Sequence, residues 1–200
     1  MNFVVLSSSR GTTFQAVLDA QKRVELTATC LGLVTDSSDR LCIERAKSAG
    51  LPFTVVERVK GESREEFDWR VDQAIRALGA DKDTVIAALG WMFIFSPWFI
   101  QTWANRIINV HPALLPRHGG KGMYGHHVHE AVLNAHEEES GVSIHLMDEG
   151  VDTGRVLLQK TCPVLPDDTP ASLQARVQDL EKLWYPQVLA MIQKNEIRLS

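Results

Sequence analysis

Short apolar runs alternate along the first half of the chain with stretches in which apolar residues recur at helical spacing. Runs such as Phe3–Leu6 are rich in β-branched residues and bounded by polar loops, as is typical of strands buried on both faces. Between them, Phe14, Val17 and Leu18 fall on one side of a helix. The pattern predicts strands at Phe3–Leu6, Thr27–Val34, Pro52–Val56, Asp83–Leu89 and Arg106–Asn109, with helices at Phe14–Arg23, Asp39–Ala49, Ser63–Leu78 and from Pro97.

Strands that alternate with helices imply right-handed crossovers and an α/β fold with a doubly wound, mostly parallel, twisted sheet that carries helices on both faces. The final third predicts a helix at His126–Ala135, two adjacent strands at Val142–Met147 and Val156–Thr161, and a long amphipathic helix at Ser172–Ile192. No repeat or linker separates the halves, so we expect one domain over residues 1–200. Ligands bind such sheets beyond the carboxyl ends of the strands, where the loops after the first, fourth and fifth strands should meet.

Composition argues against several classes of protein. A net charge of −4 gives no reason to expect nucleic acid or an anionic membrane surface as a partner. Cys30, Cys42 and Cys162 are an odd number at wide spacing, which argues against a disulfide framework. The longest apolar stretch, Val85–Ile100, is interrupted by Gly90 and is not a membrane-spanning helix. With no leader before the first strand, the sequence predicts a cytoplasmic protein.

The segment Ser7–Thr13 joins the first strand to the first helix and is made of small and hydroxyl residues around Gly11. Backbone N–H groups at a helix N-terminus, together with hydroxyls, make a site for a phosphate. The segment lacks the lysine of a Walker motif and also reads as an ordinary capped turn. Both interpretations stay open on this segment alone.

Polar side chains follow the fifth strand and recur in a later loop. Asn109 and His111 come directly after an apolar run, and the glycine-rich, basic loop Ala113–Gly122 is of the kind that closes over a charged substrate. Asp152 lies in a short acidic loop between two predicted strands. An amide, an imidazole and a carboxylate that converge can polarise a carbonyl and manage an amine proton, as acyl or formyl transfer to nitrogen requires.

The order and spacing of these residues resemble the signature of the folate-dependent formyltransferases. Asn109-x-His111-Pro-x-Leu-Leu-Pro is followed by His145-Leu and by Asp152-x-Gly154, and the likeness covers nearly the whole chain. The resemblance implies a Rossmann-like formyltransferase fold. It also implies an enzyme that transfers a formyl group from 10-formyltetrahydrofolate, a co-substrate, to the amine of glycinamide ribonucleotide in purine synthesis. No metal is expected, because this formyl donor is already activated.

The resemblance also implies a ternary site, with the phosphate held by about residues 1–105 and catalysis and the folate by about residues 106–200. Asn109, His111 and Asp152 match the family's catalytic three, and His145 would support them from behind. It further assigns Arg10, Gly11, Thr12 and Thr13 to the substrate phosphate, Arg64 and Glu181 to the rest of that substrate, and Trp91, Met92, Phe93, Ile94, Phe95, Met147, Asp148, Glu149, Gly150 and Val151 to the folate.

The chain departs from the family's usual pattern around the ligands rather than at the catalytic three. Ser9 stands for a glycine and Thr13 for an amide residue in the phosphate loop. Phe93, Phe95 and Lys182 replace arginine, leucine and histidine. We expect the changes at Ser9 and Thr13 to alter phosphate affinity before they remove function. The alternatives are a related formyltransferase for another amine, such as a sugar-nucleotide amine, and a non-catalytic paralogue that binds folate or nucleotide.

His126, His127 and His129 suggest a zinc site, but no cysteine or carboxylate partner has convincing spacing in the sequence. We therefore expect exposed histidines at a helix start and no metal. The expected partners are glycinamide ribonucleotide and reduced folate, bound by a monomer or a homodimer.

Overall fold

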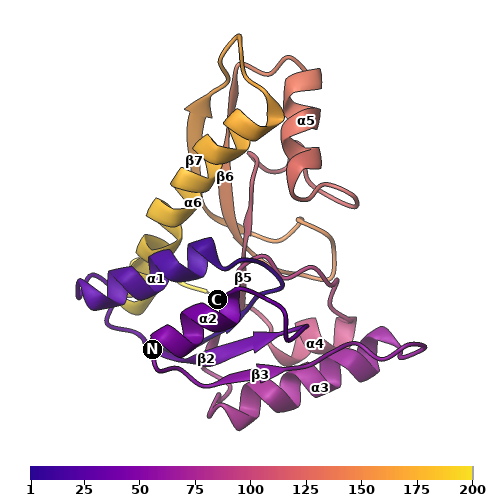
Figure 1. The fold of residues 1–200 in the computed structure, drawn as a ribbon, viewed down its shortest axis with the longest axis vertical. Helices are drawn as coiled ribbons and strands as arrows, with labels where there is room; N and C mark the ends of the chain where they lie inside the picture. The colour runs from indigo at the N-terminus through magenta and orange to yellow at the C-terminus, as the bar shows by residue number, and fades with distance from the viewer. Residues whose placement is uncertain (200) are drawn as a thin grey trace.

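The sheet of the computed structural model, which describes residues 1–199, has seven strands in the order β3-β2-β1-β4-β5-β6-β7. The first five strands run parallel, whereas β6 is antiparallel to β5 and β7 to β6. The predicted α/β fold with a mostly parallel sheet is thereby confirmed (Figure 1). The strands are β1 (Asn2–Leu6), β2 (Thr29–Thr35), β3 (Phe53–Val55), β4 (Val85–Ala88), β5 (Ile107–His111), β6 (Glu139–Leu146) and β7 (Val156–Pro163).

Two hydrophobic cores lie on opposite faces of the sheet, because side chains alternate along each buried strand. In β1, Phe3 and Val5 enter one core while Val4 and Leu6 enter the other. Residues of α1, α2, α5 and α6 fill the first core, and residues of α3 and α4 fill the second. The helices are α1 (Thr12–Lys22), α2 (Cys42–Ser48), α3 (Arg64–Ala77), α4 (Pro97–Thr102), α5 (His126–Asn134) and α6 (Pro170–Gln193).

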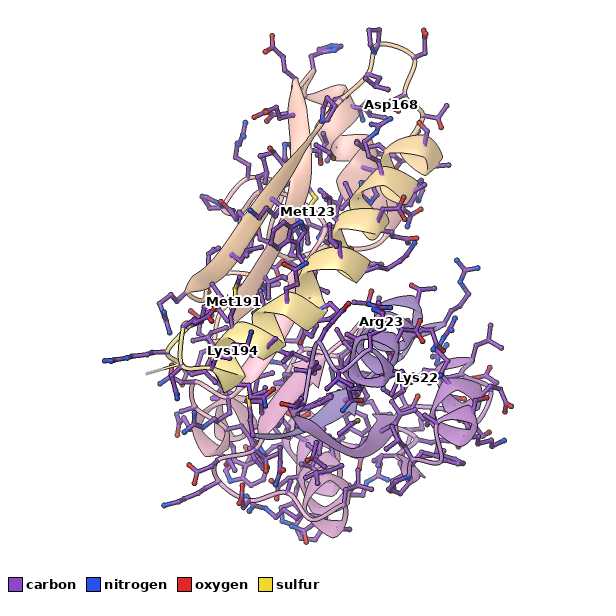
Figure 2. The ribbon with its side chains drawn as sticks, turned by 90° about the vertical axis from the view of Figure 1, so that its left-hand side faces the viewer. Lys22, Arg23, Met123, Asp168, Met191 and Lys194 are labelled. Atoms are coloured by element: carbon purple, nitrogen blue, oxygen red, sulfur yellow. The ribbon has the colours of Figure 1, made fainter. Side chains whose placement is uncertain are left out.

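The long helix α6 runs from the loop at Asp168, near one end of the molecule, to Lys194 beside the N-terminal half (Figure 2). Thr169 caps its start, and the carboxylate of Asp168 holds the preceding loop by accepting hydrogen bonds from the Leu165 N–H and the Arg176 guanidinium. That guanidinium holds the pKa of the Asp168 carboxyl well below its usual range. Further along, the buried Tyr185 hydroxyl donates to the Ile108 carbonyl at 2.9 Å, which ties α6 to β5 immediately before Asn109.

The predicted helices and strands are all present, with boundaries that move by a few residues. Strand β5 continues to His111, two residues beyond the predicted end, because β6 pairs with it over that length. Helix α2 starts at Cys42 rather than Asp39, after a turn closed by the Asp36–Arg40 ion pair. Ser63 and Glu66 form a capping box that fixes the start of α3 at the predicted position. No helix among residues 1–199 is long and apolar enough to cross a membrane.

Candidate active site

A cavity of about 680 Å³ opens beyond the carboxyl ends of β1, β4 and β5, in the size range of ligand sites. Met123, labelled in Figure 2, is among its lining residues. The prediction that the loops after these three strands share one edge is confirmed. The lining includes Arg10, Thr12 and Thr13, the aromatic segment Trp91–Phe95, Asn109 and His111, and Met147–Asp152.

Strand register brings the first pair of polar side chains together. The antiparallel pairing of β5 with β6 places His145 opposite Asn109. The Asn109 Nδ2 atom lies 3.2 Å from His145 Nε2. On the other side of the ring, His145 Nδ1 lies 2.9 Å from the Leu146 carbonyl oxygen, which can only accept a hydrogen bond. The proton of a neutral His145 therefore sits on Nδ1, and Nε2 accepts from the Asn109 amide.

His145 is buried, with 1% of its surface exposed, and its burial lowers the pKa of the imidazole. A neutral ring behind Asn109 fixes the orientation of that amide, because only the Nδ2 group can donate to His145 Nε2. The amide has two N–H groups, so one remains to donate into the cavity.

His111 has a hydrogen-bond acceptor at each ring nitrogen. Nε2 lies 2.8 Å from the His118 carbonyl oxygen, and Nδ1 lies 3.4 Å from Asp152 Oδ2. The ring is buried, so neither nitrogen is freely hydrated. A doubly protonated imidazole satisfies both acceptors, whereas a neutral ring leaves one lone pair facing an oxygen.

Asp152 lies beside both histidines and holds the glycine-rich loop. Its Oδ2 also accepts from the Gly120 N–H at 3.0 Å, and its Oδ1 lies 3.7 Å from His145 Nε2. Asp152 has a φ of 59°, a left-handed conformation that few residues other than glycine adopt. Asn109, His111, His145 and Asp152 thus form one connected group, which we call the strand-end cluster.

Gly154 lets the loop that carries Asp152 approach the sheet. A Cβ atom at Gly154 would lie 1.9 Å from the Leu146 carbonyl oxygen. That oxygen is the acceptor of the His145 Nδ1–H, and the Leu146 N–H in turn donates to the Arg155 carbonyl at 2.9 Å. Any side chain at Gly154 would therefore push the loop away from His145.

The N-terminal loop (Ser7–Thr13) presents backbone N–H groups to the cavity, whereas the strand-end cluster presents side chains. Gly11 is the N-cap of α1, has a φ of 68°, and supplies no side-chain cap. The first N–H groups of α1 are thus left for a ligand. Ser9 Oγ accepts from the Gly11 N–H at 3.1 Å and lies 3.0 Å from Ser7 Oγ, so the serine that departs from the family pattern is built into the loop.

The aromatic segment forms a stacked wall over the second core. The rings of Phe95 and Phe99 lie 4.4 Å apart and nearly parallel, and the Trp91 ring lies 6.2 Å from that of Phe95. Phe93 packs at 4.9 Å from Phe67. Phe93 and Phe95 therefore extend the core.

Glu181 on α6 links the far wall of the cavity to the N-terminal loop. Its Oε2 accepts from the Thr13 hydroxyl at 3.3 Å. Burial raises the pKa of the Glu181 carboxyl to about 7, and the Thr13 hydrogen bond opposes part of that shift. Gln174 and Gln178 line the same wall, one helical turn apart. Sequence reasoning missed both, although their spacing with Glu181 marks one face of the predicted helix.

The chain resembles known proteins along its whole length. Residues 1–189 match the family model described as formyl transferase. The chain belongs to the formyl transferase family. It is 33% identical over 199 residues to phosphoribosylglycinamide formyltransferase of Escherichia coli K12, which covers 100% of this chain and 90% of that protein. It is 35% identical over 198 residues to the trifunctional purine biosynthetic protein adenosine-3 of Drosophila melanogaster, covering 98% of this chain but only 14% of that protein.

Solved structures agree with the family. Glycinamide ribonucleotide transformylase 1 from Symbiobacterium toebii superimposes with a TM-score of 0.89 at 28% identity, covering 98% of this chain and 88% of that one. The enzyme of the same name from Geobacillus kaustophilus gives a TM-score of 0.86 at 32% identity, covering 96% and 97%. The predicted family and fold are thereby confirmed.

Three residues that the resemblance assigns to the site, Arg64, Gly11 and His145, do not line this cavity. Arg64 is exposed in the first turn of α3 and is not among the lining residues, so its contact with substrate stays a prediction. Gly11 shapes the N-terminal loop without lining the cavity. His145 lies behind Asn109, as a supporting residue would.

Two expectations about the histidines of α5 are wrong. His126 and His127 are exposed as expected, but His129 is 1% exposed and lines the cavity. Burial lowers the pKa of His129 to about 4, and its Nδ1 has no hydrogen-bond partner among residues 1–199. A carboxylate is also present at suitable spacing, since Glu130 contacts both His126 and His127.

Proposed function

We propose that this chain catalyses transfer of the formyl group from 10-formyltetrahydrofolate to the amine of glycinamide ribonucleotide, a step of purine biosynthesis. The observation that carries the proposal is the strand-end cluster at the base of a cavity, in a chain that aligns over its whole length with phosphoribosylglycinamide formyltransferases. This chain covers only 14% of the trifunctional relative, so the proposal is limited to formyl transfer and does not include that protein's other activities.

The ribonucleotide is assigned to the side of the cavity formed by α1 and α6. Its phosphate would accept from the N–H groups at the start of α1, with Arg10 and the Thr12 and Thr13 hydroxyls around it. Arg10 and Lys121 are the basic lining residues that offset the phosphate charge. Glu181 would contact the remainder of the substrate, close to Thr13.

The folate is assigned to the slot between the aromatic segment and Met147–Val151. Both segments line the same cavity. Met92 and Ile94 are 54% and 45% exposed, which leaves apolar surface for a flat pterin ring to cover. The Trp91 indole N–H is buried without a partner among residues 1–199.

The strand-end cluster has the groups that the reaction needs. The substrate amine attacks the formyl carbon and produces a tetrahedral intermediate whose oxygen carries negative charge. The free N–H of Asn109, oriented by His145, would donate to that oxygen. A protonated His111 would stabilise the same charge once its ring turns from the His118 carbonyl toward the substrate.

Asp152 would manage the proton that the amine loses. Its carboxylate lies against His111 and is held by the Gly120 N–H, so it can accept a proton directly or through one water. The proton then passes to the folate nitrogen as the C–N bond to the formyl group breaks. Each transferred atom is accounted for without a metal ion.

The broader expectations rest on the same likeness. We propose a cytoplasmic enzyme that works as a monomer or a homodimer, with glycinamide ribonucleotide and reduced folate as its partners. No nucleic acid or membrane partner is proposed, given a net charge of −4.

The test is formyl transfer by purified protein, followed through the tetrahydrofolate product. We expect turnover with glycinamide ribonucleotide that falls by about a hundredfold or more in Asp152→Asn. Asp167→Asn, an exposed aspartate in the loop before α6, is the matched control and should leave turnover unchanged. Folate binding without turnover would overturn the acceptor and direct the search to other amines. Absence of both turnover and folate binding would favour the non-catalytic paralogue.

A further inference from the structure

The first turn of α5 brings three potential metal ligands together on the surface. His126 Nε2 lies 2.7 Å from Glu130 Oε1, and His127 Nδ1 lies 3.5 Å from Glu130 Oε2. One donor atom from each of the three side chains lies within 4.8 Å of the others. We propose that His126, His127 and Glu130 form a binding site for a divalent transition-metal ion such as Zn²⁺.

Helix geometry explains why the carboxylate sits between the two rings. Glu130 is four residues after His126 and three after His127, and both spacings place side chains on adjoining parts of one helix face. A tetrahedral zinc ion with bonds of about 2.1 Å needs donor atoms about 3.4 Å apart. The side chains are 53%, 54% and 43% exposed, so they can make that adjustment without disturbing the core.

The donor set selects the class of ion. Two imidazole nitrogens and one carboxylate oxygen suit Zn²⁺, Ni²⁺ and Cu²⁺, whereas Mg²⁺ and Ca²⁺ prefer sites made of oxygen alone. Three protein ligands leave a fourth position for water. The ion would replace the contacts between Glu130 and the two histidines, and its positive charge would lie beside the carboxylate.

The proposed metal site borders the cavity but is separate from the strand-end cluster. Tyr124 and Gly125, the two residues before His126, line the cavity. The Tyr124 ring meets the His127 ring edge-on, with centroids 5.5 Å apart. A bound ion would therefore fasten the first turn of α5 next to the end of the glycine-rich loop. This inference does not depend on which amine accepts the formyl group.

Titration calorimetry of the chelator-stripped full chain with ZnCl₂ tests the proposal. We expect saturable binding of one ion per chain and a rise in melting temperature with added Zn²⁺. His126→Ala and Glu130→Gln should each weaken binding by at least about tenfold, since each removes one of three ligands. His136→Ala changes an exposed histidine outside the cluster and should leave the affinity unchanged.

Co²⁺ gives a second readout, because its visible absorption reports the ligand set directly. The native chain and His136→Ala should show the same Co²⁺ spectrum, and His126→Ala should lose it. Absence of saturable Zn²⁺ binding would overturn the proposal. So would binding that survives His126→Ala and disappears in Asp152→Asn, because the ion would then occupy the strand-end cluster.

Discussion

Two walls of the cavity, the N-terminal loop and the strand-end cluster, present different kinds of hydrogen-bonding group. The N-terminal loop offers backbone N–H groups at the start of α1, shaped by the left-handed Gly11. The strand-end cluster offers side chains, each held by another, such as Asn109 by His145. Of the departures that the sequence suggests, Ser9 and Thr13 lie in the first wall and none lies in the second. A site made of backbone tolerates side-chain change, whereas a site made of side chains does not.

The largest effect is expected from Asn109→Ala. The substitution removes the N–H that donates to the oxyanion, so kcat/KM should fall by about a hundredfold or more. Steady-state kinetics measure the loss, and calorimetry should show that folate still binds. Asn134→Ala, an exposed asparagine at the end of α5, is the control. Activity within tenfold of the native chain would remove Asn109 from the reaction.

A smaller loss is expected from Gly154→Ala, which tests the support of the strand-end cluster. The added Cβ would lie 1.9 Å from the Leu146 carbonyl oxygen and displace the loop that carries Asp152. We expect kcat to fall by roughly tenfold to a hundredfold, because small displacements of catalytic groups are costly.

Gly141→Ala provides the comparison for Gly154→Ala. Its Cβ would lie 2.0 Å from the Lys160 carbonyl oxygen, a similar clash within the β6–β7 ladder. It should lower the melting temperature while the kcat of the folded fraction changes less. Equal losses of kcat in the two variants would mean that sheet distortion, and not the position of Asp152, limits turnover.

Thr13→Ala should have a modest effect, since the N-terminal loop binds mainly through its backbone. Loss of one side-chain hydrogen bond beside several backbone donors should raise KM for the ribonucleotide by about threefold to tenfold and leave kcat unchanged. Thr29→Ala, an exposed threonine at the opposite edge of the sheet, should change neither constant. A large fall in kcat would contradict the division between the two walls.

The smallest effect concerns Glu181 on α6, which accepts a hydrogen bond from the Thr13 hydroxyl. Burial raises the pKa of its carboxyl to about 7 in the folded chain, above its ordinary value of 4.5. The folded state therefore holds a proton that the unfolded state has lost, and this contribution to stability declines as the pH rises from 4.5 through 7.

Thermal unfolding of Glu181→Gln at several pH values tests whether this contribution to stability declines as the pH rises. The melting temperature of the variant relative to the native chain should rise between pH 4.5 and 7 and then level off. Glu138→Gln, an exposed glutamate, should show no such trend. A constant difference for Glu181→Gln would show that the carboxyl is fully hydrated when folded.

Sequence reasoning found the catalytic candidates because their signal is local. Asn109 and His111 interrupt an apolar strand two residues apart, which places them on the same face. His145 could be recognised as buried, but its partner depends on the register of β5 with β6. His129 was misplaced because its burial depends on how α5 closes over the cavity, which helical periodicity does not specify.

By itself, the sequence determined the alternation of strands and helices, the parallel sheet and the edge at which ligands bind. Apolar periodicity and crossover handedness are properties of the chain and require no tertiary contact. Tertiary structure decided which side chains touch. The Asn109–His145 bond, the His111–Asp152 contact and the Thr13–Glu181 link join residues far apart in sequence, and sheet register and helix docking bring them together.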